Sequence, residues 1–184
     1  GMMVEPLPLR AHPASHPLPV QALEAMAFRE EGWLVLVFQI QGGLDRLRIP
    51  PLGPIRRGAN LWESTCFEAF LRPVGGEAYI ELNLAPSAAW DAQAFASYRR
   101  KLRSLDVDPD VRLRRGGDLL ALRARIPLEA LPGCDAGGPC DVNLAAVLED
   151  REGNLAYACL NPVGDRPDFH APEGFVLRLE GGRP

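Results

Sequence analysis

Two glutamates are the residues of this 184-residue chain with the clearest capacity for chemistry, because polar and aromatic neighbours recur around them with a two-residue period. The alternating residues are Cys66, Glu68 and Phe70 in one segment and Tyr79, Glu81 and Asn83 in the next. Carboxylates and an amide offer directional hydrogen bonds to a hydroxyl-rich or cationic ligand, and aromatic rings offer flat surfaces for stacking. The pattern predicts a binding platform, although the solvated face of an antiparallel sheet can show the same alternation.

The segments that carry these residues, 65–71 and 78–84, are predicted to be neighbouring strands. Residues 72–76 between them are rich in turn formers, which favours a β-hairpin. Alternate side chains of a strand point to the same face, so the residues of opposite parity form a continuous apolar face. We expect that face to pack in the core together with residues of other strands. The side chains expected inside the core include Phe67, Ile80, Leu82, Leu122 and Leu144.

The remaining patterns predict an all-β chain. Strand-like runs occur at residues 20–28, 33–38, 119–126, 141–148, 155–160 and 175–179, and residues 127–131 allow one short helical turn. Pro86 ends the run at 78–84, and we interpret residues 88–99 as an irregular excursion over a sheet edge. Short strands separated by turn signals, with no long amphipathic helix, predict an antiparallel β-sandwich.

Composition limits the class of protein. The 47% hydrophobic content suits one domain with one core, which we assign to residues 17–184. Residues 1–16 form a Pro-rich N-terminal segment, in which Gly1 before Met2 resembles a tag scar. Neither a secretory signal nor an apolar run of about 18 residues is found, which predicts a cytoplasmic protein without a membrane partner. A net charge of −4 with a single Lys argues against nucleic acid as a partner.

The four cysteines do not have the spacing of a zinc site. Cys134 and Cys140 bracket a Gly-rich loop and could form a small disulfide on oxidation. Cys66 and Cys159 lie in strand-like runs, where a buried thiol is expected to act as a small hydrophobic residue.

Three blocks of sequence resemble bacterial DOMON-like proteins, which are related to family 9 carbohydrate-binding modules. The first is residues 61–68, which contains Glu63, Thr65 and Cys66; the second runs from Tyr79 to Arg99; the third is Pro167, Asp168, Phe169 and His170. The resemblance extends from about residue 33 to the C-terminus, and the blocks are specific in combination. It implies an immunoglobulin-like or jelly-roll-like sandwich that binds a small molecule such as a sugar in a cleft of a curved sheet.

The resemblance also suggests roles for individual residues. Trp62 and Trp90 would stack on the apolar faces of a pyranose. The hydrogen-bonding and aromatic groups around the ligand would be Glu68, Tyr79, Glu81, Asn83, Tyr98 and Arg99. Two structural alternatives stay open at this stage: the Trp side chains could pack in the core, and the glutamates could form ion pairs with Arg99, Arg123 or Arg125.

We expect no bound cofactor, although haem and calcium are alternatives. Haem would need His170 and Met26 as axial ligands, whereas residues 168–170 are also typical of a structural turn. Calcium would need oxygen ligands, for which Asp91, Asp106 and Asp108 are candidates by composition.

An enzyme is the second functional alternative. If Glu68 and Glu81 are cross-strand neighbours, their carboxyl groups could lie about 5 Å apart, near the separation in a retaining glycosidase. Ion pairs with Arg would keep both carboxylates ionised, however, and an acid catalyst needs one raised pKa. The sequence therefore favours a non-catalytic binding module.

Overall fold

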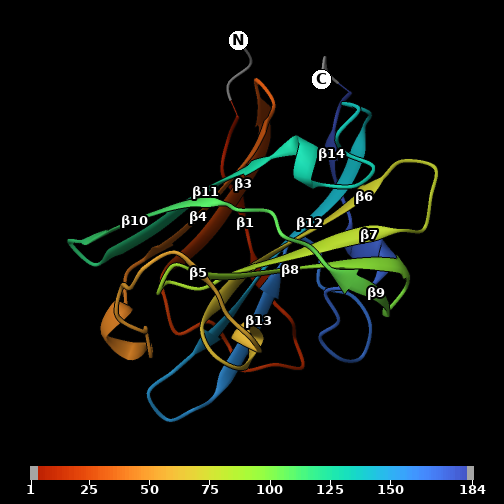
Figure 1. Cartoon of the computed structure of the whole chain (residues 1–184). Coiled ribbons are helices and arrows are strands. Elements are labelled where there is room, and N and C mark those ends of the chain that lie inside the picture. Colours follow the sequence, from red (N-terminus) through yellow and green to blue (C-terminus); the bar gives the residue numbers. More distant parts are fainter. Residues whose placement is uncertain (1–3, 182–184) are drawn as a thin grey trace.

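The computed structural model describes residues 4–181, so the expected tag scar at residues 1–3 lies outside the described residues. Two largely antiparallel sheets pack face to face, as Figure 1 shows, with one short parallel strand pair at the edge of the larger sheet. The smaller sheet has the strand order β1-β3-β4-β11-β10. Its strands are β1 (Leu7–Pro8), β3 (Ala22–Glu30), β4 (Trp33–Gln41), β10 (Asp110–Gly116) and β11 (Leu119–Pro127).

The larger sheet carries the polar–aromatic face. Its main order is β2-β13-β12-β6-β7-β8-β5, with β14 paired to β12 and β9 paired to β8. The central strands are β6 (Cys66–Pro73), β7 (Tyr79–Leu84), β8 (Ala89–Ser97) and β12 (Cys140–Glu149). The flanking strands are β2 (Arg10–Ala11), β5 (Arg56–Arg57), β9 (Arg100–Ser104), β13 (Leu155–Cys159) and β14 (Leu177–Leu179). Four short 3-10 turns complete the elements: η1 (Leu44–Arg46), η2 (Leu61–Glu63), η3 (Leu128–Ala130) and η4 (Pro172–Gly174).

The core lies between the two sheets, and the predicted sandwich is confirmed. Phe67, Leu122 and Leu144 are 0% exposed, while Ile80 and Leu82 are 2% exposed. The ring of Phe67 stacks on that of Phe38 from the opposite sheet, with centroids 5.0 Å apart. The predicted hairpin is also present, because β6 and β7 pair antiparallel across the turn-rich connection.

Two expectations about the chain path need correction. Residues 89–97 form the regular strand β8 along the whole of β7, whereas we expected an irregular excursion. Its inner positions are mostly Ala, a residue that is uncommon in strands, so the alternation was hard to recognise. The expected boundary at residue 17 does not separate the N-terminal segment from the domain, because β1 joins the smaller sheet and β2 joins the larger one.

The outer face of the larger sheet is not open to solvent. Residues 161–176, which we call the covering segment, fold back over it (Figure 1). Asn143 on β12 is 0% exposed, and its Nδ2 donates to the carbonyl of Phe169 over 3.0 Å. Gly174 lies directly above that amide, since a Cβ at this position would be 3.0 Å from Asn143 Nδ2. The segment and the sheet enclose a second apolar cluster, which contains Phe70, Tyr79, Phe95, Ala145, Cys159 and Phe175.

The side chain of His12 fixes the start of the covering segment. Its Nε2 lies 3.1 Å from the carbonyl of Val163 and 2.9 Å from that of Gly164. The N-terminal segment therefore contributes to both sheets and to the cover of the polar face. Among residues 4–181, no helix has the length and apolar character to cross a membrane.

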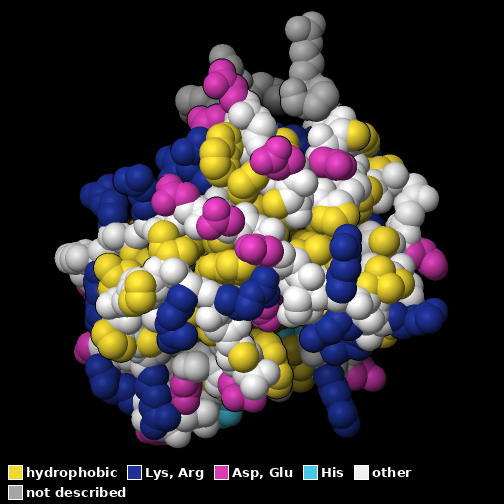
Figure 2. All heavy atoms as spheres, viewed as in Figure 1, with side chains coloured by type: hydrophobic (Ala, Val, Ile, Leu, Met, Phe, Trp, Pro, Cys, Tyr) yellow, Lys and Arg dark blue, Asp and Glu magenta, His cyan; other side chains and the backbone are white. Residues whose placement is uncertain are grey.

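The surface and the cysteines fit the composition. Figure 2 shows Lys and Arg side chains interspersed with Asp and Glu across one face of the molecule. All four cysteines are buried free thiols, as expected for Cys66 and Cys159. The sulfur atoms of Cys134 and Cys140 lie 3.3 Å apart, and a disulfide between them on oxidation stays a prediction.

Candidate functional site

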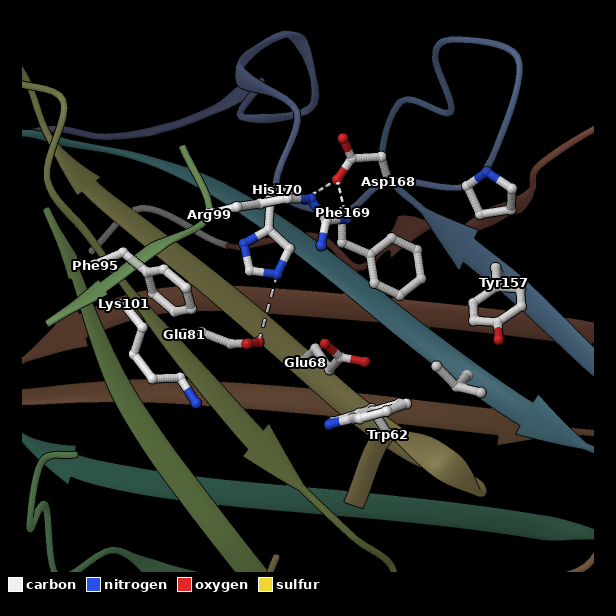
Figure 3. A pocket seen from close by; sticks show the side chains of 12 residues that line it. Trp62, Glu68, Glu81, Phe95, Arg99, Lys101, Tyr157, Asp168, Phe169 and His170 are labelled. Carbon is white, nitrogen blue, oxygen red and sulfur yellow. Dashed lines mark hydrogen bonds and ion pairs between the residues drawn. The ribbon is translucent and has the colours of Figure 1, made fainter. Parts of the chain in front are cut away.

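A cavity of about 400 Å³ lies on the outer face of the larger sheet, between the sheet, the covering segment and the turn η2. Figure 3 shows the side chains of β6, β7 and the covering segment converging on it. Its lining consists of Trp62, Glu68, Glu81, Phe95, Arg99, Lys101, Val147, Tyr157, Pro167, Asp168, Phe169 and His170. Segments about 100 residues apart in the chain thus form one concave surface.

Glu68 is the most deeply buried acidic group of this cavity, with 4% of the residue exposed. The β6–β7 register places it directly opposite Asn83, whose amide nitrogen, oriented toward Glu68, donates to Oε1 over 3.3 Å. The thiol of Cys66 lies 3.6 Å from Oε2. Burial, and next the charge of Glu81, raise the pKa of Glu68 to about 8. The carboxyl group is therefore mostly protonated at neutral pH.

Glu81 lies opposite Phe70 on β6 and Gln93 on β8, and its side chain is 12% exposed. Burial raises the pKa of Glu81 to about 7, although the positive charge of Lys101 acts in the opposite direction. Since Glu68 faces Asn83 rather than Glu81, the two glutamates are diagonal cross-strand neighbours and not a directly opposed pair.

His170 of the covering segment connects this acidic pair to Tyr79. The Tyr79 hydroxyl accepts the backbone N–H of Arg99 over 3.0 Å and lies 2.6 Å from His170 Nδ1. With the imidazole proton on Nε2, which lies 3.8 Å from Glu81 Oε2, the hydroxyl donates to Nδ1; with the proton on Nδ1, the hydroxyl accepts it. Burial, together with the charge of Arg99, lowers the pKa of His170 to about 4. The ring is neutral at pH 7, so its contact with Glu81 is dipolar and not an ion pair.

Arg99 and Asp168 form a charged pair at the rim of the cavity. Their nearest N–O distance is 2.8 Å, and Tyr98 donates its hydroxyl to the same carboxylate. Burial acts to raise the pKa of Asp168, but the hydrogen bonds from Tyr98 and Arg99 outweigh it, so the pKa is lowered. Asp168 also accepts the backbone N–H of His170 over 3.0 Å, which confirms the expected local turn. This pair holds the covering segment against the β8–β9 turn.

Aromatic side chains surround the polar groups. Trp62 on η2 is 51% exposed and is the accessible aromatic ring of the lining. Phe95 stacks on Tyr79 with centroids 4.8 Å apart and planes 4° apart. Tyr157 and Phe169 lie to the right in Figure 3, on the side away from Phe95, with ring centroids 6.0 Å apart. A planar apolar surface and a set of hydrogen-bonding groups therefore share one concavity.

The structure brings together most of the residues singled out from the sequence. Those that line the cavity are Trp62, Glu68, Glu81, Arg99, Pro167, Asp168, Phe169 and His170. Tyr79 and Asn83 lie behind the lining and position His170 and Glu68. Thr65 has a different role, since its hydroxyl donates to the carbonyl of Arg48 and accepts the N–H of Glu149. Glu63 is exposed on η2.

The expected position of Trp90 needs correction. Trp90 is paired with Leu84, an inner residue, and it is 7% exposed within the core beneath the guanidinium of Arg57. It shares the parity of Ala92 and Ala94, so it points away from the cavity. The residues that sequence reasoning missed are Phe95, Lys101, Val147 and Tyr157. The alternation of Asp91, Gln93 and Phe95 was the available signal, but it was hidden by the assignment of that segment as irregular.

The ion-pair alternative for the glutamates is wrong. Arg123 and Arg125 lie on β11 in the other sheet, where Arg123 faces Glu30 at 3.7 Å and Arg125 lies over Trp33. Arg99 pairs with Asp168 instead. Across residues 4–181, no Arg or Lys nitrogen lies within 4.0 Å of the carboxyl oxygens of Glu68 or Glu81. Glu68 is therefore buried, and Glu81 half-buried, with no Arg or Lys of the described residues at ion-pair distance.

The geometry also bears on the cofactor alternatives. Met26 lies on the outer face of the smaller sheet and His170 over the opposite face of the sandwich, so the two do not form an axial pair. Within the described part of the chain, no three His, Cys, Asp or Glu side chains are grouped for metal binding. Asp91 faces Arg57 over 2.7 Å.

No protein-family model and no curated protein sequence matches this chain. Solved protein structures do match its fold. A protein from Bacteroides uniformis ATCC 8492, described as a candidate carbohydrate-binding protein, has a TM-score of 0.73 and 16% identity over 96% of this chain and 85% of its own. A family 9 carbohydrate-binding module from Caldicellulosiruptor kristjanssonii has a TM-score of 0.57 with cellotriose and 0.55 with glucose.

Both structures of that module are 13% identical to this chain and span 98% of it, which corresponds to 84% and 85% of the module's own length. The chain shares the β-sandwich fold of family 9 carbohydrate-binding modules. The resemblance seen in the sequence is thus confirmed for the fold, and its DOMON-like component stays a prediction.

Proposed function

We propose that this protein is a non-catalytic module that binds a carbohydrate in the cavity above β6 and β7. The observation that carries the proposal is the half-exposed ring of Trp62 beside a cavity that contains Glu68, Glu81 and His170. A sugar ring presents an apolar face that can stack on an aromatic plane and a rim of hydroxyls that can bond to carboxyl and imidazole groups. The shared fold with carbohydrate-binding modules supports the same role.

The state of the two carboxyl groups favours binding over hydrolysis. A retaining glycosidase needs one ionised carboxylate as nucleophile and one protonated acid. Here the pKa values of Glu68 and Glu81 are both raised, to about 8 and about 7, so neither group is held fully ionised at neutral pH as such a nucleophile is. Protonated carboxyl groups are both donors and acceptors, which suits a polyhydroxyl ligand.

Isothermal titration calorimetry with glucose, cellobiose and a panel of soluble oligosaccharides tests the proposal. We expect binding by the wild type and a loss of about two- to tenfold in Trp62→Ala, since the contact of an aromatic ring contributes about 0.5–1.5 kcal/mol. Trp33→Ala is the matched control, because Trp33 lies on the outer face of the other sheet under Arg125. The absence of binding by any sugar, or an equal loss in the two variants, would contradict the proposed site.

A further inference from the structure

Glu68 and Glu81 differ from the other acidic side chains of this surface because they face the cavity without a cation. Asp168 has Arg99 at 2.8 Å and Asp91 has Arg57 at 2.7 Å. In residues 4–181, His170 is the only basic side chain within 4.0 Å of the two carboxyl groups, at 3.8 Å from Glu81, and its ring is neutral at pH 7. Lys101 and Arg99 also line the cavity, but their positive charges act on Glu81 from beyond ion-pair distance, and Arg99 is paired with Asp168.

The supporting residues around the pair add donors to the carboxyl groups but no positive charge. Asn83 donates an amide hydrogen to Glu68 when its nitrogen faces that residue, and Cys66 lies 3.6 Å from the same carboxyl. On the cavity side, Figure 3 shows both glutamates directed toward open space below His170. The ionised form of such a carboxyl group needs a paired cation, and a cationic ligand can supply it.

We infer that the carbohydrate bound in this cavity carries a primary ammonium group, as in an amino sugar, and that Glu68 and Glu81 are its counter-ions. The inference rests on the proposed function and names the class of sugar. An ammonium on the ring would face Glu81 while the apolar face of the same ring contacts Trp62. Neutral sugars can occupy the cavity by hydroxyl contacts alone, but they leave the two acidic groups without a cation.

Binding of such a ligand moves a proton. In the empty cavity at pH 7 much of the Glu81 and Glu68 population is protonated, since their pKa values are about 7 and about 8. When R–NH₃⁺ binds, the carboxyl O–H bond breaks, its proton goes to solvent and a carboxylate–ammonium pair remains. Charge and atoms balance as COOH + R–NH₃⁺ giving COO⁻·⁺H₃N–R + H⁺. A neutral sugar has no charge that would drive this release.

Calorimetry with glucosamine, its β-1,4 dimer, N-acetylglucosamine and glucose at pH 7 tests the inference. N-acetylation removes the charge of the amine and keeps the ring, so it is the matched ligand control. We expect the amines to bind about tenfold tighter than glucose or the N-acetyl sugar, because a charge-assisted hydrogen bond is roughly twice as strong as a neutral one. Repeating the titration in buffers of different ionisation enthalpy should show proton release for the amines only.

Glu81→Gln is the protein test, because it keeps the volume and removes the charge. It should reduce the preference for glucosamine over glucose to below about twofold and lower the proton release. Glu77→Gln, an exposed change in the same hairpin, should leave the glucosamine preference and the proton release unchanged. Glu68→Gln serves as the second variant if Glu81→Gln fails to fold.

The outcomes separate the two proposals. If glucose binds as tightly as glucosamine and no proton is released, the ammonium inference is overturned and the carbohydrate site stands. If glucosamine keeps its preference in both Glu81→Gln and Glu68→Gln, these residues are not its counter-ions and the inference also fails. If neither the amines nor any neutral sugar binds, the proposed function itself is overturned.

Discussion

The two faces of the β6–β7 hairpin are both buried, but by different means. On the inner face, Phe67 packs against the smaller sheet, whose strands are joined by continuous hydrogen-bonded ladders. On the outer face, Phe70 is equally buried at 0% exposed, but it is covered by a segment with few regular hydrogen bonds and a single 3-10 turn. The inner face excludes polar groups, whereas the outer face buries Glu68 and Asn83, beside Asn143 of the neighbouring strand β12.

This difference separates stability from binding within one pair of strands. The inner face follows the usual rule that apolar contact stabilises the fold in proportion to the buried area. The outer face holds two partly desolvated carboxyl groups beside the cavity with no Arg or Lys from the described part of the chain at ion-pair distance, an arrangement that costs stability and prepares a binding surface. The predictions below test this division, from the largest expected effect to the smallest.

The division is tested most strongly by truncating one ring on each face. Phe67→Ala should lower the free energy of unfolding by about 3–5 kcal/mol, because the cavity it leaves between two rigid sheets cannot collapse. Phe70→Ala should cost less, since the covering segment can move into the space, and it should also weaken ligand binding by displacing His170, whose ring lies 4.9 Å from that of Phe70. Urea unfolding of both variants measures the costs, and equal costs would remove the distinction between the faces.

The pH dependence of stability should come mainly from the outer face. The folded protein holds the protons of Glu68 and Glu81 more tightly than the unfolded chain, with pKa values of about 8 and about 7 against an ordinary value of 4.5. Their contribution to the free energy of unfolding is therefore present at low pH. It is lost as the pH rises from about 4.5 through about 8, by at most about 1.4 kcal/mol per pH unit for each group.

Other groups titrate in the same range with the opposite sign. His170, with its lowered pKa, makes stability rise between about pH 4 and 6.5. The pKa of Cys140 is lowered to about 7, mainly by the hydrogen bond from Cys134. Cys140 therefore makes stability rise from about pH 7 toward 9. The double variant Glu68→Gln/Glu81→Gln isolates the glutamates. Its stability relative to the wild type should increase from pH 6 to pH 8 in thermal melts, and a constant difference would show that the glutamates are not buried as described.

The attachment of the covering segment should depend on Asn143. Asn143→Ala removes the hydrogen bond to Phe169 and should cost about 1–3 kcal/mol. Hydrogen exchange should then accelerate in residues 161–176 and stay unchanged in β4 and β11. Asn161→Ala is a suitable comparison, because its bond to Glu173 lies at the exposed side of the same segment and should matter less. Uniform acceleration over both sheets would show that the covering segment is part of a single cooperative core.

The smallest effect on stability is expected for Trp62. Its ring is 51% exposed, so Trp62→Ala should change the free energy of unfolding by only about 0.5 kcal/mol while it weakens sugar binding. Trp90→Ala should lower the free energy of unfolding by about 3–5 kcal/mol, because this ring is 7% exposed in the core, without a direct effect on sugar contacts. Denaturation curves beside binding titrations compare the two directly. A large loss of stability in Trp62→Ala would place that ring among the structural residues.

The sequence by itself determined which side chains share a face. Side chains on a strand alternate strictly, so the parity of Glu68 and Glu81 separated them from Phe67 and Leu82, and the turn-rich residues between them specified the hairpin. The same rule applied to β8 would have placed Trp90 inside and Phe95 outside, but the strand was not recognised because Ala fills its inner positions.

Only the tertiary structure decided what lies against those faces. No local pattern relates residues 167–170 to β6 and β7, which are about 90–100 residues away in the chain, so the covering segment and its contact between His170 and Tyr79 could not be read from spacing. Which arginine meets which carboxylate was equally undetermined, because Arg123 and Arg125 have the right charge but belong to the other sheet. The raised pKa values of Glu68 and Glu81 follow from that arrangement, since desolvation depends on the atoms that surround a group in space and not on its neighbours in sequence.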